Sequence, residues 1–149
     1  MLNDKCAKFI NQIVSGRTGN PYDSRKQLIT DLNSVAGGNG GVFFGGNRAG
    51  GDARGTIAGG NAEIRIDTMR QFTDPKRAFG AAFVTLHELI HIIAGNDQQL
   101  SEQVKKLGIT VIAYPGKTVP YPTDADNKNL QYSGYWGQAL KNACDPKGY

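Results

Sequence analysis

Both histidines of this 149-residue chain lie within one short stretch, His87-Glu88-Leu89-Ile90-His91. The surrounding segment 75–94 has a broad apolar stripe at helical spacing, and Thr73-Asp74-Pro75 is typical of a helix start. Burying two imidazoles and a carboxylate in an apolar helix costs free energy unless these groups have polar partners. The fold must therefore bring a partner to this helix, which constrains the chain more than any other feature of the sequence.

A metal ion is the partner that this spacing favours. Residues four apart in a helix lie on one face, about one turn from each other. His87 and His91 can therefore bind one zinc ion, each at about 2.0–2.1 Å. Glu88 is one residue further round the helix, where it can take a proton from a water on the same ion. The sequence thus predicts Zn2+ as a cofactor, with Glu88 as the general base.

The third zinc ligand is less well defined. A catalytic zinc ion usually has three protein ligands and one open position for water. The chain has no third histidine, so a carboxylate or, as a weaker candidate, a tyrosine must complete the site. Asp97 is the first candidate because Gly95 lets the chain leave the helix and fold back. Asp97 can instead serve as the N-cap of a helix over 98–107, a role that Asn96 can also take. The other candidate ligands are Glu102, Asp124 and Asp126.

The stretch 87–97 resembles the extended zinc-binding helix of the zincin metallopeptidases. It is closest to the metzincin pattern H-E-x-x-H-x-x-G-x-x-H/D, and the form ending in Asp is similar to the small snapalysin-type neutral proteases. The resemblance implies that His87, His91 and Asp97 bind zinc, that Glu88 is the general base, and that the chain hydrolyses peptide bonds. The C-terminal part also looks like small bacterial HExxH domains, some at the ends of secreted or toxin-like proteins.

The remaining segments predict an α+β fold. Further helices are expected over 4–15, 24–36 and 132–144, and a long surface loop over 114–129. Apolar and polar residues alternate over 61–67, which predicts a strand with one buried face. Shorter strands are expected at 42–44, 56–58 and 109–113. We therefore expect one zincin-like domain over 1–149, in which a small twisted sheet packs on the HExxH helix and further helices flank it.

The resemblance also implies how a substrate would bind. In zincins the strand before the active helix is a sheet edge that pairs with the peptide substrate. This assigns substrate binding to Ile64, Arg65 and Ile66. A donor for the tetrahedral oxyanion is also expected. Tyr132 and Tyr135 are candidates because family members often use a tyrosine downstream of the ligands, although either can instead pack the last helix.

The two cysteines, Cys6 and Cys144, lie near opposite ends of the chain. A disulfide between them would close a very long loop and stabilise the fold by about 3–5 kcal/mol in the chain-entropy model. It would also indicate an oxidising compartment, whereas two free buried cysteines are the alternative. We expect a secreted or extracellular protein whose leader or upstream domain is not in this chain, and a cytoplasmic protein is the alternative.

The charge distribution argues against several partners. The net charge of +4 is mild and the basic residues are scattered, so no nucleic acid is expected. No apolar run reaches the roughly 18 residues of a membrane helix, so no membrane is expected either. We predict a monomeric zinc endopeptidase that acts on a peptide or protein substrate. The alternatives are a toxin-type effector domain of a larger secreted protein and a non-catalytic zincin-like module that binds peptides.

Overall fold

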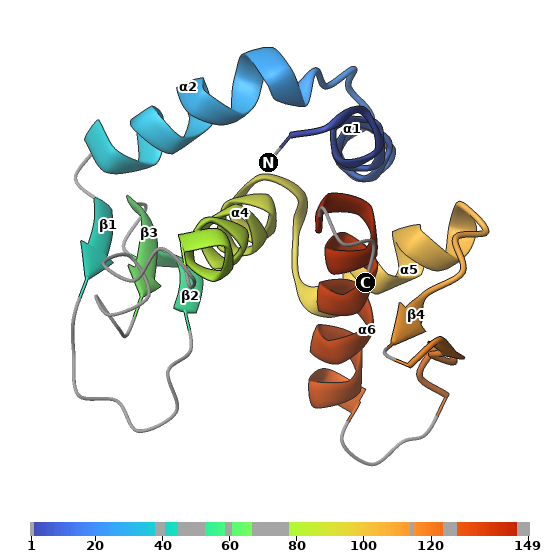
Figure 1. The fold of residues 1–149 in the computed structure, drawn as a ribbon. Coiled ribbons are helices and arrows are strands. Elements are labelled where there is room, and N and C mark those ends of the chain that lie inside the picture. Colours follow the sequence, from blue (N-terminus) through green and yellow to red (C-terminus); the bar gives the residue numbers. More distant parts are fainter. Residues whose placement is uncertain are drawn as a thin grey trace. The chain divides into compact units, whose positions relative to one another are not determined.

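Helix dominates the computed structural model of this chain, which describes residues 2–37, 41–44, 53–58, 61–66, 78–113, 115–123 and 128–145. Along these residues the elements are α1 (Asp4–Thr18), α2 (Ser24–Gly37), β1 (Gly41–Phe44), β2 (Ala53–Ala58), β3 (Asn61–Ile66), α4 (Ala78–Ala94), α5 (Asp97–Lys106), β4 (Ile112–Ala113), β5 (Lys117–Thr118) and α6 (Lys128–Cys144) (Figure 1). Within the described ranges, no helix has the length and apolar character needed to cross a membrane.

The predicted fold class is wrong. A zincin-like α+β fold with a twisted sheet on the active-site helix was expected, but the protein is mostly helical, with five helices over the described residues. Segment 109–113 was expected to be a strand, and only Ile112–Ala113 pairs, with the two residues of β5. Helix α6 begins at Lys128, within the predicted loop, and so is four residues longer than expected. Helix thus extends by about one turn into the segment that the sequence suggested was irregular.

The chain divides into two compact units, one formed by Met1–Ser24 with Ala94–Tyr149 and the other by Arg25–Ile93. A single domain over 1–149 stays a prediction. In the first unit, α1, α5 and α6 pack on one another. The Phe9 ring stacks on that of fully buried Trp136, with centroids 5.9 Å apart and planes 15° apart. The other fully buried side chains of this core include Ile10, Ile13, Leu100, Val104, Val111 and Leu140.

Local sequence fixes the ends of α1 and its approach to α5. The Asn3 side chain accepts a hydrogen bond from the Cys6 main-chain N–H at 2.8 Å, as expected of an N-cap. Gly19 ends the helix with a φ of +73°, which glycine adopts without strain. At Gly16 a Cβ atom would collide with the amide group of the buried Gln103 side chain. Glycine at this position therefore lets α1 and α5 approach closely.

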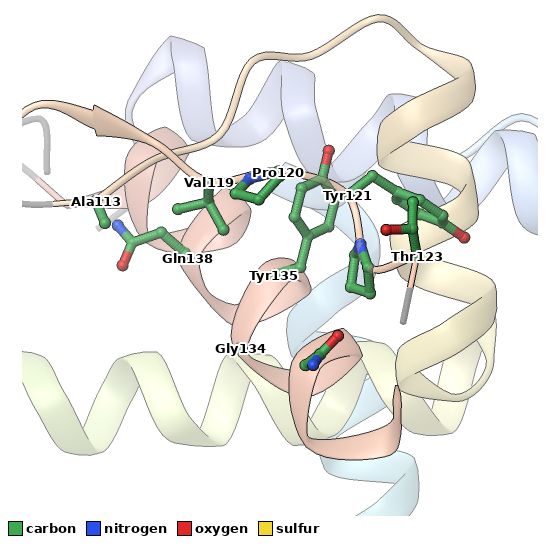
Figure 2. Close-up of a pocket in the computed structure, with 10 residues that line it drawn as sticks. Ala113, Val119, Pro120, Tyr121, Thr123, Gly134, Tyr135 and Gln138 are labelled. Carbon is green, nitrogen blue, oxygen red and sulfur yellow. The ribbon is translucent and has the colours of Figure 1, made fainter. Parts of the chain in front are cut away.

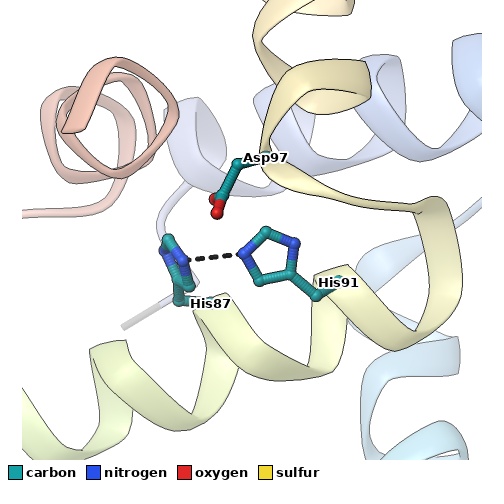
Figure 3. Close-up of side chains that lie close together, drawn as sticks. All are labelled: His87, His91 and Asp97. Atoms are coloured by element: carbon teal, nitrogen blue, oxygen red, sulfur yellow. Dashed lines mark hydrogen bonds between the residues drawn. The ribbon is translucent and has the colours of Figure 1, made fainter. Parts of the chain in front are cut away.

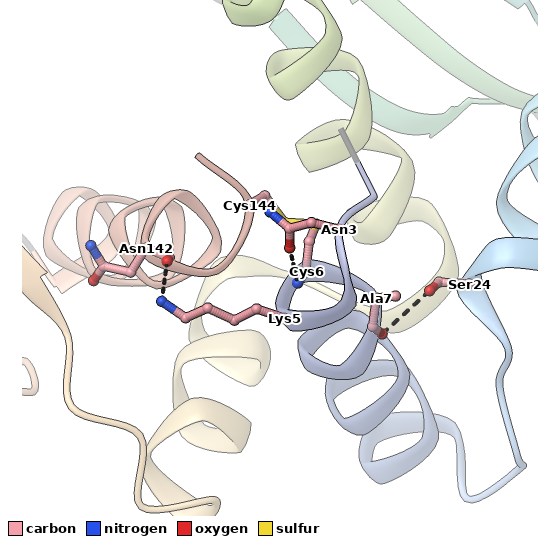
Figure 4. Close-up of a disulfide and its surroundings, with 7 residues drawn as sticks. All are labelled: Asn3, Lys5, Cys6, Ala7, Ser24, Asn142 and Cys144. Carbon is pink, nitrogen blue, oxygen red and sulfur yellow. Dashed lines mark hydrogen bonds between the residues drawn. A yellow bond between two sulfur atoms is a disulfide. The ribbon is translucent and has the colours of Figure 1, made fainter. Parts of the chain in front are cut away.

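The predicted disulfide between Cys6 and Cys144 is confirmed, and it joins α1 to α6 (Figure 4). Beside it, Lys5 Nζ donates to the main-chain oxygen of Asn142 at 2.8 Å. The Asn142 side chain in turn accepts from the N–H of Ile112 and donates to its carbonyl, both at 2.8 Å. The end of α6 is thus bound covalently to α1 and by hydrogen bonds to β4.

The second unit contains a three-stranded sheet in the order β1-β3-β2. Strand β3 pairs with β1 in parallel and with β2 in antiparallel register, with Arg65 opposite Phe43 on one side and Arg54 on the other. The strand predicted over 61–67 is confirmed as far as Ile66, and Asp67 lies outside the described residues. β3 is therefore the central strand of its sheet.

Candidate metal centre

Helix α4 brings the two histidines together on one face. His87 Nε2 lies 2.9 Å from His91 Nε2, and the ring centroids are 4.6 Å apart (Figure 3). Both side chains are half-buried, whereas Leu86, Leu89 and Ile90 are buried. The apolar residues of the motif therefore anchor the helix, and the two imidazoles point their Nε2 atoms at each other.

Asp97 is the first residue of α5, and Gly95 and Asn96 alone separate it from α4. Gly95 has a φ of +120°, a conformation that residues with a Cβ rarely adopt. The Asn96 side chain accepts from the Gln99 N–H, and the Gln99 side chain accepts from the Asn96 N–H, both at 3.0 Å. This reciprocal pair is a capping box, so Asn96 rather than Asp97 caps the helix. The capping role that the sequence left open for Asp97 is therefore taken by Asn96.

His87, His91 and Asp97 form a compact donor group (Figure 3). One ligand atom from each residue lies within 4.8 Å of the other two, and all three side chains are half-buried. Oδ1 of Asp97 is shielded from solvent. Within the described residues this is the set of three potential ligands that the fold assembles, and Asp97 is its carboxylate member.

The donor group fits a zinc ion. Two ligands at about 2.0–2.1 Å from a tetrahedral zinc are about 3.3 Å apart, so small side-chain shifts suffice from the present separations. Two histidine nitrogens and a carboxylate oxygen are a donor set found in catalytic zinc sites. Without the metal, the 2.9 Å approach is a hydrogen bond between the rings, with one Nε2–H donating and the other Nε2 accepting. A bound zinc ion would instead take the Nε2 lone pair of each ring.

Glu88 lies beside this group on α4. At about 100° per residue, it is about 100° round the helix from His87 and about 60° from His91. It is only 9% exposed, which makes it a buried carboxylate next to two potential metal ligands. A bound metal ion would place a positive charge close to this carboxylate and so favour its ionised form.

The other acids considered as ligands fall into two groups. Glu102 is exposed on α5 and accepts a hydrogen bond from Gln98 Nε2 at 3.0 Å, and it is not part of the donor group. Asp124 and Asp126 lie outside the described residues. Asp97 is therefore the ligand that the described structure favours.

The residues expected to bind substrate, Ile64, Arg65 and Ile66, all lie in β3. They were assigned this role because a zincin substrate pairs with a sheet edge. Both sides of β3 are already paired, with β1 and with β2. A peptide could add to β3 only if one of these strands left, so strand addition at these residues lacks an open edge.

Tyr132 and Tyr135, the candidate oxyanion donors, belong to an aromatic cluster with Tyr121 on the C-terminal side. The Tyr121 ring centroid is 5.8 Å from that of Tyr132 and 5.6 Å from that of Tyr135. Burial, followed by a hydrogen bond with Tyr132, raises the pKa of Tyr121 to about 12, and burial raises the pKa of Tyr135. The Tyr135 hydroxyl therefore remains protonated at neutral pH. The role of Tyr132 and Tyr135 towards an oxyanion stays a prediction.

Sequence reasoning missed two residues that shape these regions. Tyr121 was assigned to a loop, although its flanking prolines, Pro120 and Pro122, are typical of a fixed extended segment. Arg17 on α1 donates a hydrogen bond to the Ala94 carbonyl at the end of α4. Local sequence patterns do not predict a contact between residues so far apart in the chain.

Comparisons of the chain with known protein families, with curated proteins and with solved structures find no match. The metal centre is therefore interpreted from its own residues.

Proposed function

We propose that this protein is a zinc-dependent endopeptidase in which His87, His91 and Asp97 bind the metal and Glu88 is the general base. One observation carries the proposal: the histidine Nε2 atoms are 2.9 Å apart, and a carboxylate oxygen completes a donor group within 4.8 Å. The likeness to zincins that supports it is confined to residues 87–97 and does not extend to the fold.

The residues of the site divide the chemistry among them. Bound zinc would supply Lewis-acid polarisation of a water and of a substrate carbonyl. His87 and His91 contribute neutral nitrogen lone pairs, and Asp97 contributes one negative charge. The Glu88 carboxylate accepts the proton of the attacking water and passes it to the leaving amine. The buried leucines and isoleucine of α4 hold the helix that orients His87, Glu88 and His91.

The number of donors favours catalysis over a purely structural role. Structural zinc sites are usually closed by four protein ligands, whereas catalytic sites have three and keep one position open. Three residues make up the donor group in the part of the chain that the structure describes. This arrangement supports a peptidase over the non-catalytic module that binds peptides.

The disulfide supports an extracellular setting for this activity. Disulfides form and persist in secreted proteins and are rare in reducing compartments. The Cys6–Cys144 bond joins positions 138 residues apart, and both cysteines are fully buried. We expect the protein to work where this bond stays oxidised.

Metal analysis combined with a peptidase assay tests the proposal. Protein purified without chelator should hold about one zinc per chain and should cleave quenched fluorescent peptides of mixed sequence. The Glu88→Gln variant should keep the zinc and lose hydrolysis, because only the proton acceptor is removed. Glu102→Gln, an exposed carboxylate of α5, is the matched control and should change neither property. Zinc uptake without hydrolysis by the unaltered protein would instead indicate the non-catalytic module.

A further inference from the structure

A pocket of about 540 Å³ lies between α6 and the extended segment 119–123 (Figure 2). Its volume falls within the range of about 300–1,000 Å³ that is usual for ligand sites. The segment contributes Val119, Pro120, Tyr121 and Pro122 to the lining, and α6 contributes Gly134 and Tyr135. Among the described residues that line it there is no acid and no base, so this lining favours an uncharged ligand.

Gly134 shows that the space beside α6 is kept open. It lies in the interior of the helix, where glycine is destabilising relative to alanine. A Cβ atom at this position would meet nothing within 4 Å, so no neighbour among the described residues requires a glycine. Gly16 differs, because the Gln103 side chain occupies the place of its missing Cβ. A mid-helix glycine that faces a pocket lets a ligand approach the helix backbone.

Tyr135 offers a polar group to the same pocket. Figure 2 shows its ring rising from α6 towards Pro120 and Tyr121. The residue is 5% exposed and is one of those that line the pocket. A tyrosine hydroxyl can donate a hydrogen bond to an acceptor on a ligand. Burial raises the pKa of Tyr135, so the hydroxyl remains a donor at neutral pH.

The walls indicate which uncharged ligand fits. The Tyr121 and Tyr135 rings stand at 86° to each other with centroids 5.6 Å apart, and prolines adjoin them. Grooves lined by aromatic rings bind proline-rich segments in the polyproline II conformation. Such a segment is preformed, has no internal hydrogen bonds, and presents compact rings beside unpaired carbonyl oxygens. Its rings match the apolar walls, and its carbonyls are acceptors for the Tyr135 hydroxyl.

We propose that this pocket binds an uncharged, proline-containing peptide segment in the polyproline II conformation, which packs over Gly134 and accepts a hydrogen bond from Tyr135. Lys105 Nζ lies 4.3 Å above the Tyr121 ring, and this contact holds Tyr121 in place from α5. Gln138 Nε2 donates to the Ile112 carbonyl at 2.9 Å, which fixes another lining side chain. The site is thus largely preformed. It is independent of zinc and goes beyond the proposed peptidase function.

Titration with an acetylated and amidated hexaproline, followed by NMR of the protein amides, tests this proposal. Zinc is removed with a chelator, so that cleavage cannot interfere and failure of the peptidase proposal leaves this result unaffected. We expect saturable shifts centred on Gly134 and Gln138. Gly134→Leu, which fills the pocket from a helical position, should weaken binding at least about tenfold. Lys141→Leu adds the same side chain at an exposed position of α6 outside the pocket and should bind as the unaltered protein does.

A second variant tests the hydrogen bond. Tyr135→Phe keeps the ring and removes the hydroxyl, so it should weaken hexaproline binding several-fold and leave thermal unfolding nearly unchanged. This variant also decides the outcome if Gly134→Leu does not fold. The absence of saturable binding to the unaltered protein would overturn the proposal. Equal affinity for a blocked glycine–serine hexamer, or an affinity that neither variant lowers, would overturn it as well.

Discussion

Arg17 donates a hydrogen bond from Nε to the main-chain oxygen of Ala94, 3.1 Å away, although 77 positions separate them in sequence. Ala94 is the last residue of α4, where carbonyl groups lack helical partners and the helix dipole favours a positive charge. A terminal nitrogen of the same guanidinium also lies beside Gly95. Arg17 therefore holds the turn through which the chain passes from the histidines to Asp97.

Replacing Arg17 should weaken zinc binding without removing a ligand. Arg17→Ala leaves the Ala94 carbonyl without this donor and loosens the turn, so we expect zinc affinity to fall by about tenfold, as for other supporting residues of metal sites. Calorimetric titration with zinc measures it. Lys8→Ala, which removes a positive charge from an exposed position of α1, is the control and should bind zinc as before. Equal affinities of the two variants would show that Arg17 has no positioning role.

Gly95→Ala should disturb the same turn from within. A Cβ at Gly95 would be strained at a φ of +120° and would collide with the Gln99 side chain, which takes part in the capping box. We expect the free energy of unfolding to fall by about 1–2 kcal/mol and zinc binding to weaken. Gly19→Ala is the matched control, because its φ of +73° is also positive but nothing lies within 4 Å of the added atom. It should cost about 1 kcal/mol and leave zinc affinity unchanged. Equal effects of both variants on zinc would contradict this explanation.

Several elements follow from sequence alone because their information is local. The apolar face of α1 and its Asn3 cap predict that helix, and the alternation in β3 predicts that strand. The spacing of His87 and His91 predicts a shared site, since four residues make one helical turn. Local patterns do not reveal pairing partners, so the central position of β3 could not be predicted.

The fold class failed for a related reason. The strands expected at 42–44 and 56–58 lie within β1 and β2, whereas only Ile112–Ala113 of the strand expected at 109–113 pairs, and helices make up most of the described structure. The polar start of α6 at Lys128 has no strong apolar periodicity, so its first turn was assigned to a loop. The sequence does not distinguish Asn96 from Asp97 as the N-cap of α5. Because Asn96 is the cap, the Asp97 side chain can face the histidines.

Reducing the disulfide should destabilise the protein strongly. The Cys6–Cys144 bond restricts the unfolded chain over 138 positions, which the chain-entropy model values at about 3–5 kcal/mol. Urea unfolding with and without dithiothreitol measures this difference. The double variant Cys6→Ala and Cys144→Ala should be about as stable as the reduced protein, both with and without dithiothreitol. A midpoint of the unaltered protein that reductant does not shift would contradict a stabilising role.

Alkaline pH should lower stability through Tyr121. Its pKa is about 12 in the folded protein, chiefly because of burial, against about 10 in the unfolded chain. Between these values the unfolded chain binds fewer protons than the folded one, so the free energy of unfolding falls as pH rises from about 10 to 12. This contribution is fully present below pH 10. Urea unfolding at several pH values should show a weaker dependence for Tyr121→Phe, and an unchanged dependence would contradict the assignment.

Calorimetric titration of the metal-free protein with zinc tests the central claim most directly. We expect one zinc per chain. Asp97→Asn should lower the zinc affinity by more than the roughly 10–100-fold that is typical when a residue supporting a metal ligand is replaced. Glu102→Gln should bind zinc as the unaltered protein does, because its carboxylate is exposed and lies outside the donor group. The absence of zinc uptake by the unaltered protein would contradict the metal centre, and an affinity that Asp97→Asn leaves unchanged would contradict Asp97 as its third ligand.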